Sequence, residues 1–377
     1  MFGMRRSSRS WVALGLVLLG VAMLAFALLG RRVRAARFLE RLSQKPALAA
    51  TAPVQPSVVT RDLTIDGEHG PIRARLYFRA DRPRGAGIVV AHGVHYRGID
   101  EARLMPFARA LAESGQVVLT PELAELADYR ITPASVSVIR SSVAYLASDR
   151  VHVDGERVGL LGFSFAGGLA LVAAQAPETA SRLSFVTSVG GHHDLRRVLR
   201  FLIHDEIETP TGIVRSTANE YGLVVLIYGN LEHFVAATDL PTMRAGFKAW
   251  LQEDRPRARA LASLRTTPEA DELWQLLETQ RLQTLAPRLD ALLASQQEQL
   301  SSLSAAGHLQ RLGLPVYLLH GSHDSVIPPS ETDSAGLELN AAEHEALVSP
   351  LIEHVEVAHA ASYVDKLSLV SFMAHML

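Results

Sequence analysis

The chain of 377 residues contains no cysteine, and this absence removes several kinds of site from consideration. Disulfide bonds are excluded, and cysteine usage carries no information on the redox compartment. The 15 histidines show no metal-binding spacing such as HExxH, so the sequence predicts no bound metal. Internal repeats and low-complexity tracts are also missing. The aromatic content of 6% and the charged fraction of 20% are ordinary for a globular enzyme.

Charge is distributed unevenly along the chain. Residues 1–45 contain nine Lys or Arg and one acidic residue, a local charge of +8, whereas the remaining 28 basic and 38 acidic residues give −10. The basic residues bracket the uninterrupted apolar run Trp11 to Gly30, so they do not form a nucleic-acid patch. A helix of 20 residues spans about 30 Å, the thickness of a hydrocarbon core. We therefore expect a single-pass membrane anchor at 11–30, after a basic tail at 1–10.

Two alternatives to this topology stay open. A cleaved signal peptide usually has a shorter apolar region followed by an A-x-A-like site, whereas Arg31 and Arg32 follow here at once. The basic flanks favour a cytoplasmic catalytic domain by the positive-inside rule, but by a small margin over the opposite orientation. Residues 31–57 are expected to tether the anchor to the enzyme, since their second half is rich in Ala, Pro, Gln and Ser.

The turn around Ser164 is the most informative motif in the rest of the chain. Residues 158–161 predict a buried strand and residues 166–175 a helix, with Ser164 between them. This is the context of a nucleophile elbow, where small neighbours let the helix approach the strand closely. Gly162 fits the pattern. Ala166 replaces the usual second glycine and predicts mild crowding. Taken alone, the turn also fits any α/β protein with a Gly/Ser turn.

Two further strands supply an acid and a histidine. The stretch PVYLLHGSHDSVIP is a strand that ends in a polar turn carrying Asp324, and residues 351–359 are expected to form a last strand that ends at His359. Serine, acid and histidine thus occur in the order Ser164, Asp324, His359, each beyond a predicted strand, which is the order of an α/β-hydrolase. These segments, together with residues 88–93, resemble the α/β-hydrolase superfamily. The string around Ser164 is similar to its dienelactone-hydrolase and prolyl-oligopeptidase-like branches.

The resemblance implies a role for each of these side chains. His359 takes the proton of Ser164 as the serine attacks a carbonyl, and Asp324 holds the imidazole in the right tautomer. His354 is the alternative base. Asp194, after the preceding strand, is the alternative acid, because some members of the superfamily place the acid there.

An acyl-transfer site also needs hydrogen-bond donors for the oxyanion. The resemblance assigns them to the backbone N–H groups of Phe165, after the nucleophile, and of Val94, in the HG-type loop after strand 87–91. The Tyr96 hydroxyl is a weaker candidate donor. The remaining histidines near these motifs are expected to brace the backbone rather than to act in catalysis: His92, His95, His192, His193, His320 and His323.

Periodicity predicts an α/β fold with a mostly parallel, doubly wound sheet, made by residues 58–194 and 311–377. Residues 58–66 and 72–79 alternate as strands and predict an opening hairpin. Residues 195–310 do not fit the alternation of strands and helices. Their leucines recur at steps of three and four, which predicts an inserted helical cap that roofs the active site.

The sequence thus predicts a membrane-anchored serine hydrolase of carboxyl esters or thioesters with an apolar acyl group, and no cofactor. A prolyl-oligopeptidase-like serine peptidase and a catalytically inactive, membrane-tethered binding protein are the alternatives. Because sheet, cap and triad all lie beyond Val58, a chain starting there is expected to keep its activity.

Overall fold

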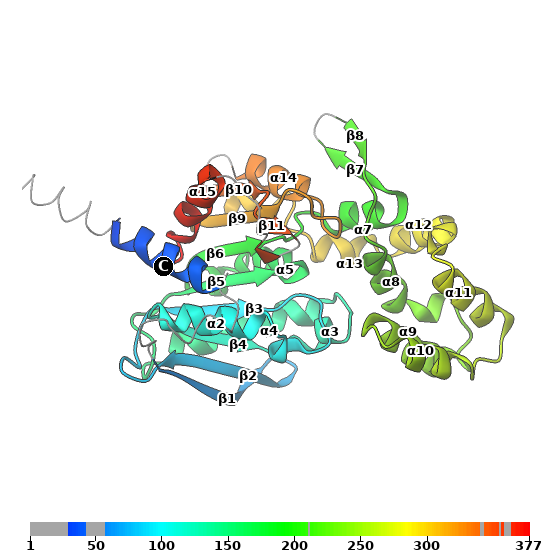
Figure 1. The fold of residues 1–377 in the computed structure, drawn as a ribbon, viewed down its shortest axis with the longest axis horizontal. Helices are drawn as coiled ribbons and strands as arrows, with labels where there is room; N and C mark the ends of the chain where they lie inside the picture. Colours follow the sequence, from blue (N-terminus) through cyan, green and yellow to red (C-terminus); the bar gives the residue numbers. More distant parts are fainter. Residues whose placement is uncertain (1–28, 43–56, 210–211, 340–342, 354–355, 358–362) are drawn as a thin grey trace, which may run out of the picture.

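The computed structural model describes residues 29–42, 57–209, 212–339, 343–353, 356–357 and 363–377. A sheet of eight strands runs through the molecule in the order β1-β2-β4-β3-β5-β6-β9-β10 (Figure 1). The strands β1 and β2 form an antiparallel hairpin, β2 pairs antiparallel with β4, and the other neighbours pair in parallel. The predicted mostly parallel sheet and its opening hairpin are confirmed. The strands span Val58–Gly67, Gly70–Arg79, Gly87–Ala91, Val117–Pro121, Val158–Phe163, Leu183–Val189, Val316–Gly321 and His344–Ser349.

Helices cover both faces of the sheet, as predicted. Successive strand residues point to opposite faces, so Leu160 joins one apolar core and Leu161 the other. The first core is covered by α4 (Pro133–Ser148), α5 (Phe165–Ala174) and α14 (Ser330–Glu338), with the short helices α3 (Ala124–Ala127) and α6 (Pro177–Ala180) beside them. The second core is covered by α2 (Leu104–Glu113), α15 (Tyr363–Met373) and a helix over residues 29–42.

Helix 29–42 differs from the expected tether at 31–57. It lies beside α15 in Figure 1, and its residues Ala35 and Phe38 are fully buried. The physical reason is an apolar stripe at steps of three and four, formed by Ala35, Phe38, Leu39 and Leu42, between the basic residues of this segment. Residues 11–28 of the expected anchor and residues 43–56 of the expected tether lie outside the described residues. No helix among the described residues is long and apolar enough to cross a membrane.

The end of the sheet also differs from the expectation. Residues 344–349 form the edge strand β10, which pairs in parallel with β9. The segment expected to be the last strand instead contributes a small separate hairpin, β11 (Ile352–Glu353) with β12 (Glu356–Val357). In this hairpin Ile352 pairs with Val357, so these residues do not belong to a strand of the main sheet.

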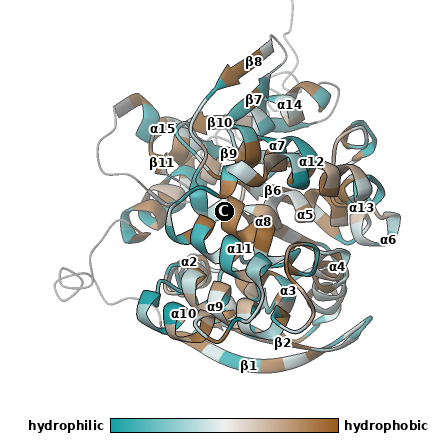
Figure 2. Cartoon of the chain, turned by 90° about the vertical axis from the view of Figure 1, so that its right-hand side faces the viewer, coloured by the Kyte–Doolittle hydropathy of each residue, from teal (hydrophilic) through white to brown (hydrophobic). Residues whose placement is uncertain are grey.

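The segment between β6 and β9 is mainly helical. The helix α8 (Glu220–Tyr228) is apolar over most of its length and its residues from Gly222 to Tyr228 are buried (Figure 2), so it is a core helix of the insertion. The hairpin of β7 (Glu206–Thr209) and β8 (Gly212–Arg215) was not predicted, and Figure 1 shows it projecting from the body. The helices span Leu195–His204 (α7), Glu220–Tyr228 (α8), Leu240–Leu251 (α9), Arg255–Ala262 (α10), Pro268–Glu278 (α11), Ala286–Ser295 (α12) and Gln297–Ser302 (α13).

Candidate active site

Ser164 lies at a sharp turn between β5 and α5. Its φ of 53° and ψ of −134° are unusual for a residue other than glycine, and such strained backbone is held only where surrounding contacts determine it. Here the Ser164 N–H donates to the Val189 carbonyl at 2.8 Å, and the Gly167 N–H donates to the Ser164 carbonyl at 2.7 Å. The geometry is that of a nucleophile elbow.

The small residues around the elbow are required by close contacts. A Cβ built on Gly162 would lie 2.2 Å from the Ala166 carbonyl oxygen, so no larger residue fits without a shift of the backbone. The methyl group of Ala166 is itself fully buried in the first core. A Cβ on Gly167 would lie 2.6 Å from Ser188 Oγ, so this glycine lets α5 approach β6.

The loop after β3 passes against the serine. A Cβ built on Gly93 would lie 3.0 Å from the Cβ of Ser164, and Val94 lines the same cavity as Ser164. Phe165 is the first residue of α5, where helix N–H groups have no partner within the helix. Both residues expected to donate to an oxyanion are therefore next to the serine.

His92 braces this loop, as expected. Its Nε2 accepts the Leu123 N–H at 2.9 Å, so its Nδ1 carries the proton and donates to the Gly93 carbonyl at 2.8 Å. Burial lowers the pKa of His92 to about 4, which keeps the ring neutral. Tyr96 is 37% exposed, and its ring stacks on His95. It is absent from the lining of the cavity at Ser164, so Tyr96 is a poor oxyanion donor.

Asp324 is held rigidly in the loop after β9. Its Oδ1 accepts the N–H groups of Val326 and Ile327 at 2.9 and 3.1 Å, and the residue is buried. His320 lies beneath it, fully buried, with Nε2 2.8 Å from the Ile327 carbonyl and Nδ1 2.8 Å from Thr332 Oγ1. His320 thus braces the acid loop, as expected.

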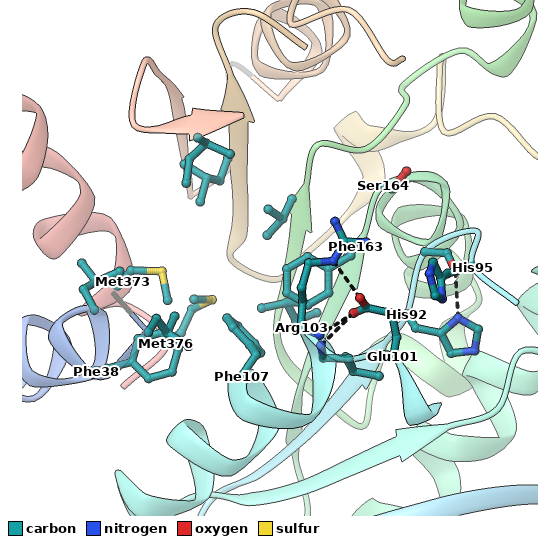
Figure 3. Close-up of a pocket in the computed structure, with 18 of the residues that line it drawn as sticks. Phe38, His92, His95, Glu101, Arg103, Phe107, Phe163, Ser164, Met373 and Met376 are labelled. Atoms are coloured by element: carbon teal, nitrogen blue, oxygen red, sulfur yellow. Dashed lines mark hydrogen bonds and ion pairs between the residues drawn. The ribbon is translucent and has the colours of Figure 1, made fainter. Parts of the chain in front are cut away.

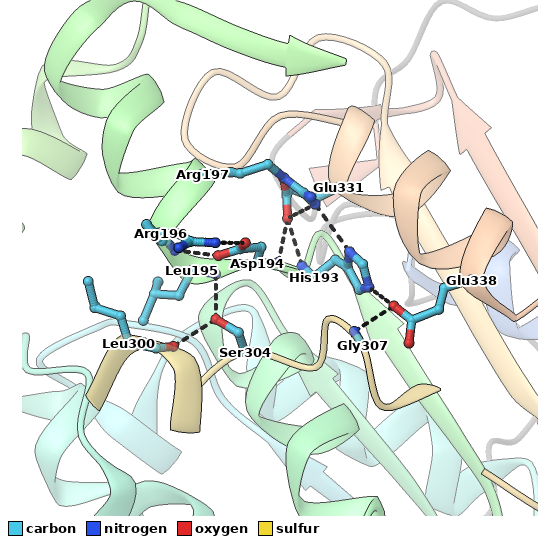
Figure 4. Close-up of polar contacts among 10 residues, drawn as sticks. All are labelled: His193, Asp194, Leu195, Arg196, Arg197, Leu300, Ser304, Gly307, Glu331 and Glu338. Atoms are coloured by element: carbon cyan, nitrogen blue, oxygen red, sulfur yellow. Dashed lines mark hydrogen bonds and ion pairs between the residues drawn. The ribbon is translucent and has the colours of Figure 1, made fainter. Parts of the chain in front are cut away.

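The competing acid, Asp194, has a structural role. Its carboxylate caps α7 by accepting the Arg196 N–H at 2.9 Å and pairs with the Arg196 guanidinium at 3.1 Å. Its own N–H donates to Glu331 on α14 at 2.7 Å, as does that of His193 at 2.9 Å (Figure 4). The buried Glu331 also pairs with Arg197. This network fixes the start of the insertion to the core.

His359 and His354 both lie outside the described residues. What the structure describes nearby is the hairpin of β11 and β12, which ends two residues before His359.

An apolar cavity of about 140 Å³ adjoins Ser164 (Figure 3). Most of its apolar lining comes from the second core, and none of the described residues that line it belongs to the cap. The cap is hydrogen-bonded to both loops of the site: the Tyr221 hydroxyl donates to the Val94 carbonyl at 3.3 Å, and the Asn219 N–H donates to the carbonyl of Ser325, next to Asp324, at 2.7 Å. Several lining residues were not predicted from the sequence: Phe38, Leu39 and Leu42 on helix 29–42, Phe107 on α2, and Leu369, Met373 and Met376 at the carboxyl end.

A charged pair lies at the serine end of the cavity. Figure 3 draws Glu101 and Arg103 on the side of His92, away from Phe38 and Met373. The Arg103 Nε donates to Glu101 at 2.7 Å, and Glu101 also accepts the N–H groups at the start of α2. Among the described residues, no group of three or more His, Asp or Glu could hold a metal ion.

Solved structures that are similar to this chain include three that share little sequence with it. No family model matches the chain, and no curated protein matches its sequence. The chain is similar to a hyperthermophilic esterase from the archaeon Pyrobaculum calidifontis, at 18% identity and a TM-score of 0.44, over 84% of this chain and 82% of that one. An acetyl xylan esterase from Paenibacillus sp. R4 is 17% identical, with a TM-score of 0.47, over 92% of this chain and 94% of that one. An acylaminoacyl peptidase from Pyrococcus horikoshii is 11% identical, with a TM-score of 0.46, over 79% of this chain and 38% of that one.

The fold follows from the chain's own geometry. A mostly parallel sheet with an antiparallel second strand, helices on both faces and a serine elbow after β5 make up the α/β-hydrolase fold.

Proposed function

We propose that this protein is a membrane-anchored serine hydrolase that cleaves a carboxyl ester or thioester with an apolar acyl group. The observation that carries the proposal is the strained backbone of Ser164 at the elbow. The same serine lines an apolar cavity. Strain of this kind is retained where a function depends on it.

The reaction proceeds through an acyl-enzyme. The oxygen of Ser164 bonds to the substrate carbonyl carbon while His359 takes the hydroxyl proton, and the bond to the leaving oxygen or sulfur breaks as His359 returns that proton. Water then attacks the acyl-enzyme with His359 as base and releases the acid. Asp324 orients His359. The N–H groups of Phe165 and Val94 stabilise the negative charge on the carbonyl oxygen.

Pre-steady-state kinetics tests this proposal. Mixing the full chain with a p-nitrophenyl ester should release a burst of about one nitrophenolate per active site before the steady state, because acylation precedes slower deacylation. A panel with thioesters and acylated peptides separates the activities. Exclusive turnover of peptides would support the peptidase alternative, and turnover of none would support the binding protein.

The membrane anchor at 11–30 is part of the proposal. Its support is the length of the apolar run and its basic flanks. Amino-terminal sequencing of the native protein tests it together with an alkaline carbonate wash of membranes. Retention of Trp11 and of the protein in the washed membranes is expected, and a mature chain that begins after residue 30 would show a cleaved signal instead.

A further inference from the structure

Helix 29–42 is attached to the hydrolase core by specific contacts. Phe38 is fully buried, and the Arg41 guanidinium pairs with the buried Glu113 of α2 at 3.3 Å. Arg34 donates to the carbonyl oxygen of Leu377 at 3.1 Å, so the helix also contacts the carboxyl end of the chain. These contacts make the helix a part of the enzyme rather than a linker.

A row of three aromatic rings connects this helix to the nucleophile. Phe38 packs edge-on against Phe107 of α2, with ring centroids 5.3 Å apart, and Phe107 packs edge-on against Phe163 at 4.9 Å. Phe163 is the last residue of β5 and directly precedes Ser164. Edge-on packing of this kind adds stability and fixes ring orientation.

The same helix forms one wall of the cavity at Ser164. Phe38, Leu39 and Leu42 line it. Beside it, the carboxyl end contributes Leu369, Met373 and Met376, and the sheet contributes Leu161, Val189 and Leu319. These side chains offer no hydrogen-bonding group except the weak thioether acceptors, so this part of the cavity suits a hydrocarbon chain.

The volume limits the length of that chain. An apolar cavity of roughly 150 Å³ holds one benzene molecule, which has six carbons. The cavity of about 140 Å³ therefore accommodates an acyl group of about six carbons. The two methionines are flexible enough to adapt to a neighbouring length.

We propose that helix 29–42 is the wall that sets acyl-chain length, and that the substrate is an ester or thioester of an acyl group of about six carbons. This inference rests on the proposed function. It also changes one expectation from the sequence: a chain starting at Val58 lacks this wall, so it should lose its preference for such acyl groups.

The test measures kcat/KM for p-nitrophenyl esters from acetate to laurate, with the full chain in phospholipid nanodiscs. Burial of each methylene should raise kcat/KM about fourfold up to hexanoate, and the increase should stop beyond it. Leu39→Trp fills the cavity, so the ratio of kcat/KM for hexanoate to kcat/KM for acetate should fall at least about tenfold.

The matched control is Val33→Trp, which places the same side chain on the exposed side of the same helix, since Val33 is 40% exposed. Its length profile should equal that of the wild type. Phe38→Leu provides a second variant in case Leu39→Trp does not fold. It enlarges the cavity and should move the optimum toward octanoate.

Labelling by a short-chain fluorophosphonate separates this inference from the proposed function. Labelled, active variants with an unchanged length profile would overturn the inference and leave the proposed function standing. A wild-type protein that is neither labelled nor active on any ester would overturn both.

Discussion

The Tyr221 hydroxyl on α8 of the cap donates a hydrogen bond to the carbonyl oxygen of Val94 at 3.3 Å. Val94 follows Gly93, which lies against Ser164. Tyr221 is partly buried, and burial raises the pKa of its hydroxyl well above the ordinary value, so the donor stays protonated. The cap is therefore bonded to the loop whose N–H is assigned to the oxyanion.

Tyr221→Phe should lower kcat with little change in KM, because the loop loses a brace that matters most when charge develops on the carbonyl oxygen. One hydrogen bond contributes about 1 kcal/mol, which corresponds to about fivefold in rate. Steady-state kinetics on a single ester measures the effect.

The control for this prediction is Tyr228→Phe. It removes another tyrosine hydrogen bond from the same helix, the 3.0 Å bond from Tyr228 to the Asp128 carboxylate, which does not involve the oxyanion loop. Equal losses of kcat in the two variants would show that Tyr221 only stabilises the cap.

Gly162→Ala should distort the elbow. The added methyl group would meet the Ala166 carbonyl oxygen at 2.2 Å, and the start of α5 must shift to make room. A displacement of about 1 Å at a nucleophile costs on the order of 100-fold in rate. Gly313→Ala, where nothing lies within 4 Å, is the matched control and should keep full activity. Wild-type turnover in Gly162→Ala would argue against the elbow as the reaction centre.

Asp324→Asn should lower kcat by about 10⁴-fold, because an amide favours the wrong tautomer of the catalytic histidine. Asp194→Asn should change kcat little, since Asp194 caps α7 and pairs with Arg196. Parallel kinetics of the two variants with the same ester decides between the acids. A reversed pattern would assign the acid to the earlier strand.

Acid should destabilise the fold partly through His92. Burial holds its pKa at about 4, below the ordinary 6.5, so between these values the unfolded chain binds a proton that the folded chain does not. The contribution of neutral His92 to the free energy of unfolding is fully present above pH 6.5. It is lost as the pH falls through about 4, and the loss is about 3 kcal/mol. Urea unfolding at pH 7 and at about pH 4 should therefore show that the free energy of unfolding falls less between these pH values for His92→Gln than for the wild type. An equal loss in both proteins would contradict this assignment.

Much of the fold could be predicted because local patterns agree with it. The apolar runs that became β3 and β5, the small residues around Ser164 and the polar turn at Asp324 each reflect a local requirement. The bracing role of His92 was also anticipated, since a histidine in a tight loop usually satisfies backbone groups.

The acyl cavity could not be predicted as readily, because its walls come from opposite ends of the chain. Phe38 and Met376 line one cavity, although all strands of the sheet lie between them in the sequence. One signal was present and overlooked: Ala35, Phe38, Leu39 and Leu42 recur at helical spacing within a basic segment. The edge strand at 344–349 was missed because its residues mix polar and apolar types, as an exposed edge permits.

Identification of the residue that a fluorophosphonate modifies tests the central claim most directly. The phosphonyl group should be found by peptide mass spectrometry on Ser164, because only an activated serine oxygen displaces the fluoride rapidly. Ser164→Ala should fold normally and lose both the label and ester turnover, since a triad member acts as part of a unit. Undiminished labelling of Ser164→Ala, or a label on a different serine, would contradict the account.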